Sequence, residues 1–199
     1  MTALRSWLGR NPRTGNDHLP DARKTRAAAE RGAAAYQVED VLCDVDLFRR
    51  LRARGQARGS VGLDDLTAAL RLVAGEPFSA LRDSGWTWIL EGDRIDQVMA
   101  SAIVDVAHLV TTHALAAGDL DLARFAAETS CNAAPYDDIG RLDLVQVASL
   151  SGQSEDAERH LIDGVLNRSD DDLGPVDLPD RTARIVRQRT WNSRPQSTK

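Results

Sequence analysis

The stretch Leu115-Ala116-Ala117-Gly118-Asp119, followed by Ala123, is echoed 34 residues later by Leu150-Ser151-Gly152-Gln153, followed by Ala157. A period of 34 residues is typical of tetratricopeptide helix pairs. In each copy the glycine can close a helix-to-helix turn, and the alanine lets the second helix of the pair approach the first closely. Such repeats stack into a scaffold that holds partners in its groove. The spacing therefore predicts a binding module.

Apolar residues at three- and four-residue steps around this echo predict a mostly α fold, a tetratricopeptide-like helical repeat stack. One helix is expected from Asp44, and a second from Leu63 until Gly75 and Pro77 end it; the two form an antiparallel pair. The other expected helices cover Asp93–Ala117, Leu120–Ala134, Ile139–Leu150, Glu155–Leu166 and a short Thr182–Arg189. The stack is assigned to residues 44–190, and residues 191–199 are expected to be a disordered tail.

Residues 1–43 have a different pattern and are treated as a separate region. Leu4–Leu8 is expected to be the end of a helix that Gly9 stops, and a loop rich in turn formers and basic residues follows. Ala35–Glu39 alternates apolar and polar residues, which predicts a short strand of a β-hairpin.

Charge is divided unevenly between the front and the body of the chain. The net charge is −5. Twelve basic and seven acidic residues lie up to Arg58, and thirteen basic and twenty-three acidic residues follow. A basic front is compatible with DNA contact, with a solvated basic surface as the alternative. The DNA-contact candidates are Arg5, Arg10, Arg13, Arg23, Lys24 and Arg26.

The sequence offers no motif for catalysis or for a cofactor. Gly59-Ser60-Val61-Gly62 lacks the spacing of a nucleophile elbow, and no phosphate-binding loop occurs. His108 and His113 are five residues apart, which places their rings on different sides of a helix and argues against a shared metal ion. We therefore expect no enzymatic activity, no cofactor and no metal.

We expect a cytoplasmic chain. The longest uncharged apolar stretch, Val106–Gly118, is shorter than the roughly 20 residues of a membrane span, and no signal peptide is expected. Cys43 and Cys131 are too few for a disulfide framework, as in a reducing compartment.

Two tryptophans mark a candidate partner-binding surface. Trp86 and Trp88 belong to a linker, Glu76–Trp88, that is rich in large apolar residues. If the linker is extended, the two side chains point to opposite sides. One is then expected to pack in the core, and the other to line a partner groove.

Several of these segments together resemble the bacterial transcriptional activator domain of SARP-like regulators. The similarity is carried by Asp46–Leu51, Ala68–Phe78, Trp86, Ala117–Asp119 and Ala133–Asp137, and it covers roughly residues 44–168. The resemblance implies a tetratricopeptide-type domain that follows a winged-helix DNA-binding domain. Leu4–Gly9 is similar to the recognition helix of that domain and Ala35–Val38 to its last strand, so residues 1–43 would be a partial winged-helix remnant.

The resemblance leaves two interpretations open. In the first, the chain is a non-enzymatic regulatory module that mediates self-association or partner binding, with DNA contact if a complete winged helix is supplied. In the second, it is an interaction scaffold of a larger envelope-associated protein of the LysM type that does not bind DNA. The earlier strands and the first two helices of a winged helix have no counterpart here.

Overall fold

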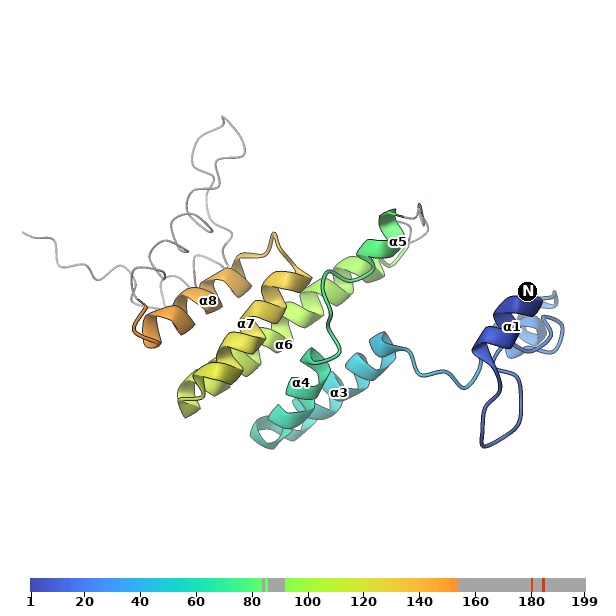
Figure 1. Cartoon of the computed structure of the whole chain (residues 1–199), viewed down its shortest axis with the longest axis horizontal. Coiled ribbons are helices and arrows are strands. Elements are labelled where there is room, and N and C mark those ends of the chain that lie inside the picture. The colour runs from blue at the N-terminus through green and yellow to red at the C-terminus, as the bar shows by residue number, and fades with distance from the viewer. Residues whose placement is uncertain (84, 86–91, 154–179, 181–183, 185–199) are drawn as a thin grey trace, which may run out of the picture. The chain divides into compact units, whose positions relative to one another are not determined.

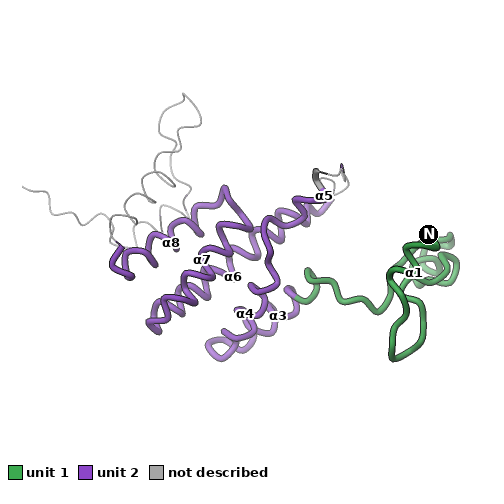
Figure 2. The backbone as a smooth tube through the Cα atoms, in the orientation of Figure 1, with its two compact units in different colours: residues 1–47 green, residues 48–199 purple. Residues whose placement is uncertain are grey.

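The computed structural model describes residues 1–83, 85, 92–153, 180 and 184. It divides the chain into two compact units, Met1–Leu47 and Phe48–Lys199 (Figure 2), and each is described by itself. The described residues are mostly helical and contain no strand, in agreement with the predicted mostly α class. The helices expected at 155–166 and 182–189 and the tail at 191–199 lie outside the described residues or fall largely outside them.

The first unit contains two short helices, α1 (Thr2–Leu8) and α2 (Arg26–Arg31). Gly9, with φ of 70°, ends α1. Thr25 precedes α2: its Oγ1 accepts a hydrogen bond from the Ala28 amide and donates one to the Ala35 carbonyl at 2.7 Å. This buried threonine thus caps the helix and ties the following segment back to it.

The β-hairpin predicted at residues 35–39 is not formed. The segment makes single backbone hydrogen bonds to separate partners, from Ala35 to Ala22 and from Glu39 to His18. The alternation is also inverted, because Tyr36 and Val38 are exposed while the Gln37 side chain accepts a hydrogen bond from the Ala27 amide. Since that polar side chain caps α2, the period-two pattern reflects a capping contact and not a sheet.

The second unit is built from the remaining helices (Figure 1). They are α3 (Asp44–Arg58, whose first residues belong to the first unit), the 3-10 turn η1 (Gly59–Gly62), α4 (Leu63–Leu70), α5 (Ser79–Asp83), α6 (Ile95–Ala117), α7 (Leu120–Ala133) and α8 (Asp138–Leu150). The bounds of α6, α7 and α8 agree with the sequence expectations within a few residues, whereas α4 ends at Leu70, five residues before Gly75. The turn η1 and helix α5 were not expected, since α5 lies in the segment predicted to be a linker.

Helix α6 is the centre of the second unit, because α4, α7 and α8 all contact it. Val106, Ala107 and Val110 are completely buried along it. By length and composition α6 could cross a membrane, and half of its most apolar window is buried inside the protein. Contact with three other helices accounts for that apolar composition.

The same turn closes both copies of the 34-residue echo. Gly118 (φ 77°) follows α6, where the Asp119 amide donates to the Ala114 carbonyl and the Gly118 amide to the Leu115 carbonyl. After α8, Gly152 (φ 79°) repeats the arrangement through Gln153 to Ala148 and Gly152 to Ser149. Each is a Schellman ending, which favours glycine because the residue adopts a left-handed conformation.

Ala123 lies where three helices meet. It is completely buried in α7, in one cluster with Ala114 of α6 and Val147 of α8. A methyl group is the whole side chain at this point, so the helix axes approach closely. Ala157, its counterpart in the second copy, lies outside the described residues.

A glycine pair brings α3 against the start of α4. A Cβ atom on Gly62 would collide with backbone atoms of Gly55, and one on Gly55 would lie 2.7 Å from the Leu66 side chain. Both glycines are buried. The close approach of these two backbones leaves no room for any other residue type at position 62.

We expect Gly62→Ala to lower the free energy of unfolding by about 3 kcal/mol or more, because the obstacle is backbone and cannot rotate away. Gly75→Ala is the matched control, since nothing lies within 4 Å of a Cβ atom at that position. It should change stability by less than about 0.5 kcal/mol. Urea unfolding of both variants measures this, and equal stabilities would contradict the proposed crossing.

Candidate functional site

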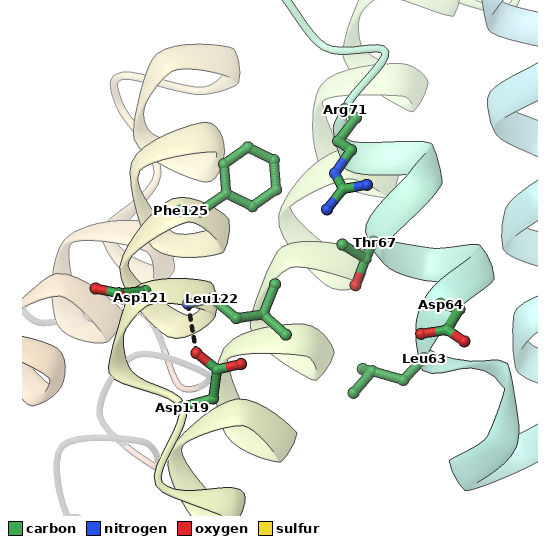
Figure 3. Close-up of a pocket in the computed structure, with 8 residues that line it drawn as sticks. All are labelled: Leu63, Asp64, Thr67, Arg71, Asp119, Asp121, Leu122 and Phe125. Atoms are coloured by element: carbon green, nitrogen blue, oxygen red, sulfur yellow. Dashed lines mark hydrogen bonds between the residues drawn. The ribbon is translucent and has the colours of Figure 1, made fainter.

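An open groove lies between α4 and α7 in the second unit (Figure 3). Its volume is about 460 Å³. It is lined by Leu63, Asp64, Thr67 and Arg71 on the side of α4, and by Asp119, Asp121, Leu122 and Phe125 on the side of α7. We refer to these eight residues as the α4–α7 groove.

Apolar side chains form the middle of the groove. Leu63 and Leu122 point toward one another across it, and the Phe125 ring extends into the gap from α7 (Figure 3). All three are only half-buried. Apolar surface that remains accessible along a groove gains free energy when a partner covers it.

Charged groups stand at the two ends of the groove. Arg71 extends into the gap near Phe125, whereas Asp64 and Asp119 lie toward the other end, where α4 and α7 begin (Figure 3). Asp119 is committed to a structural role, because its Oδ1 accepts a hydrogen bond from the Leu122 amide at 3.0 Å. Within the part of the chain that the structure describes, the Arg71 and Asp64 side chains make no ion pair.

The α4 side of the groove is held in place by a buried carboxylate. Asp65 follows Asp64 in the chain, and its carboxylate accepts hydrogen bonds from two arginines of α3, from Arg54 at 2.6 and 2.9 Å and from Arg58 at 3.1 Å. The hydrogen bond from Arg54, assisted by Arg58 against the cost of burial, lowers the pKa of Asp65 from its ordinary value. These ion pairs fix the first turn of α4 on α3.

The lowered pKa predicts a loss of stability in acid. The folded state binds a proton at Asp65 less readily than the unfolded chain does. The contribution of Asp65 to folding stability is therefore complete above the pKa of the unfolded chain, ordinarily 3.8. It is lost as the pH falls through the lower pKa of the folded state. Asp65→Asn should be less stable than wild type at pH 7 and should lose less stability on acidification. Urea unfolding between about pH 5 and pH 2 tests this, and parallel curves would contradict it.

A second buried carboxylate joins α6 to α8. Asp143 is fully buried, and its two oxygens lie 3.0 and 3.1 Å from His108 Nδ1. Within the described residues, His108 makes no hydrogen bond to a hydroxyl or thiol, and its contact with Asp143 connects α6 to α8. Sequence reasoning placed His108 on a buried helix but missed this partner. The signal was an aspartate within the apolar run of α8, between Leu142 and Val145.

We expect His108→Ala to lower the free energy of unfolding by about 1.5–3 kcal/mol, because a buried carboxylate loses a hydrogen-bond donor. His113→Ala on the same helix is the control: that side chain is exposed, and its one hydrogen bond within the described residues is to the Leu109 carbonyl. Its effect should be below about 0.5 kcal/mol. Denaturant melts at pH 7 compare the two, and similar decreases in stability would show that the His108 contact contributes little.

The candidate DNA contacts all belong to the first unit but differ in their surroundings. Arg5 donates to the Leu19 and Pro20 carbonyls, Arg10 pairs with Asp17, and Arg26 pairs with Glu30. The other three candidates are exposed on loops and make no ion pair within the described residues: Arg13, Arg23 and Lys24. Trp86 and Trp88, the candidates for a partner groove, lie outside the described residues.

Among the residues that the structure describes, the other histidine, cysteine and acidic side chains are not clustered. No group of three or more histidine, cysteine or acidic residues within the described ranges could hold a metal ion. Burial raises the pKa of the Cys131 thiol to about 11, which keeps it protonated near neutral pH and poorly nucleophilic.

Comparison of the chain with protein-family models, with curated proteins and with solved structures finds no match.

Proposed function

We propose that the chain is a non-enzymatic regulatory module that binds a protein partner or a second copy of itself through the α4–α7 groove. The groove is the observation that supports this. Half-buried Leu63, Leu122 and Phe125 form its middle. At its ends stand Arg71 and Asp64, which make no ion pair with any residue that the structure describes. An apolar centre with a polar rim is the arrangement of protein-binding surfaces.

The finer architecture belongs to the same proposal. The matching Schellman endings at Gly118 and Gly152 support a tetratricopeptide-like stack over residues 44–190. We assign the module to a cytoplasmic SARP-like transcription regulator, on the resemblance described above. Residues 1–43 are then a remnant of a winged helix whose strand, expected at residues 35–38, is not formed, and Arg13, Arg23 and Lys24 contact DNA phosphates once the rest of that domain is supplied.

One observation favours the alternative of an envelope-associated scaffold without DNA binding. Arg5, Arg10 and Arg26 are engaged inside the first unit, by carbonyl groups or by carboxylates. Side chains that already have partners must exchange them before they can contact phosphate. These internal contacts therefore engage half of the six DNA-contact candidates.

Site-specific photo-cross-linking tests the groove as the binding surface. With p-azidophenylalanine in place of Asp121, at the rim, the full chain expressed in its native cells should form one dominant adduct with a defined protein or with a second copy. The same residue in place of Glu128 is the control, because that exposed position lies on α7 but does not line the groove. Equal labelling at both positions, or none, would reject the groove as the binding surface.

DNA titration separates the two interpretations of the first unit. On the regulator interpretation, the chain alone should bind duplex DNA weakly, with little sequence preference and with an affinity that falls steeply with salt. Replacing Arg13, Arg23 and Lys24 together by alanine should reduce the salt slope by nearly 3, about 0.9 for each phosphate that is no longer neutralised. Fluorescence anisotropy measures both quantities, and no binding at low salt would favour the scaffold.

A further inference from the structure

The charged residues of the α4–α7 groove are arranged asymmetrically along its length. In Figure 3, α4 and α7 both start at the end where Asp64 and Asp119 lie, and Arg71 projects into the gap at the opposite end, near Phe125. Arg71 and Asp64 are seven residues apart along one helical stretch, which separates their backbones by about 10 Å. The groove is thus positive at one end, apolar in the middle and negative at the other.

The charges that give this direction are available to a partner. Arg71 and Asp64 are exposed and have no ion pair in the described part of the chain, whereas the neighbouring Asp65 is engaged by Arg54 and Arg58. Asp119 serves as the cap of α7. Complementary charges at the rim of an interface set the orientation and identity of a partner more than they set its affinity.

The apolar residues in the middle of the groove determine which partner side chain can bind between its two charged ends. Leu63, Leu122 and Phe125 come from both walls and are half-buried, so a side chain inserted there contacts apolar surface on two sides. Thr67 is the other residue in this part of the lining. Aliphatic or aromatic anchors suit such a position.

We propose that the α4–α7 groove binds an amphipathic helical segment of a partner protein in one orientation. An acidic residue of the segment pairs with Arg71, an apolar residue packs against Leu122 and Phe125, and a lysine or arginine pairs with Asp64. The acidic and basic residues of the segment are about seven positions apart, to match the spacing on α4. This inference rests on the proposed partner-binding function and specifies the partner's chemistry.

The test starts from a random 12-residue peptide library displayed on phage and selected on the full chain. Enriched peptides should carry an acidic and a basic residue about two helical turns apart with apolar residues between them. Arg71→Glu and Asp64→Arg should each weaken the best peptide about five- to tenfold in fluorescence anisotropy, because an attraction becomes a repulsion. Glu128→Arg, on α7 outside the groove, should leave the affinity unchanged.

Charge exchange distinguishes recognition from a merely structural role of these side chains. Binding to Arg71→Glu should be restored when the acidic residue of the peptide is replaced by lysine, and binding to Asp64→Arg when its basic residue is replaced by glutamate. A decrease in fold stability could not be rescued by a change in the peptide. Failure of both rescues, or enriched peptides without this charge pattern, would overturn the inference.

The outcome also separates this inference from the proposed function. A partner could cross-link specifically at position 121 and yet bind with an affinity that Arg71→Glu and Asp64→Arg do not change. That result would keep the groove as the binding surface and reject the inferred charge pairing. Sedimentation of the chain alone shows whether it forms a dimer, in which a second copy could occupy the groove. A dimer dissociated by Arg71→Glu would assign the groove to self-association and overturn the inferred partner segment.

Discussion

The close approach of α6, α7 and α8 at small side chains is the constraint on which the second unit depends. Ala114, Ala123 and Val147 meet there with almost no exposed surface. A second close approach occurs at Gly140 of α8, where a Cβ atom would lie 2.7 Å from the Ser130 hydroxyl oxygen of α7. Closely packed helices fix one another's position, and α4 rests on the resulting surface. The α4–α7 groove therefore lies between helices that both pack against α6.

Buried carboxylates supply the specificity that apolar packing alone lacks. Asp65 binds two arginines, Asp96 pairs with Arg94, and Asp143 receives His108. The hydrogen bond from Arg94 lowers the pKa of Asp96, as Arg54 does for Asp65. A buried carboxylate is costly without partners, so the Asp65 and Asp143 pairs favour one alignment of the helices that they join. Asp96 and Arg94 both lie at the start of α6, so their pair acts within that helix.

The two units differ in how much of their apolar surface they bury. In the first unit Leu19 and Ala28 are the buried hydrophobic residues, while Trp7 and Tyr36 remain largely exposed. Polar contacts such as those of Thr25, Gln37 and Arg5 hold this unit together. In the second unit, α4, α7 and α8 contact α6, and buried residues occur along it from Asp96 to Ala114. Binding that depends on a rigid surface is thus better served by the second unit.

The sequence by itself determined helices α6, α7 and α8 of the second unit and the glycine turns that end α6 and α8. Periodic apolar residues and the glycines at 118 and 152 act within a few residues of the chain, so local rules placed α6, α7 and α8 almost to the residue. The same local rules were wrong at residues 35–39, because the alternation there depends on Gln37 reaching Ala27, ten residues away.

Only the tertiary structure decided which side chains share a site. The α4–α7 groove joins residues 63–71 with residues 119–125, and Asp143 meets a histidine 35 positions earlier. No periodicity specifies such pairs, since they depend on how helices cross. Local pattern sets what each helix can bury, whereas the small residues at the crossings decide which surfaces remain open to a partner.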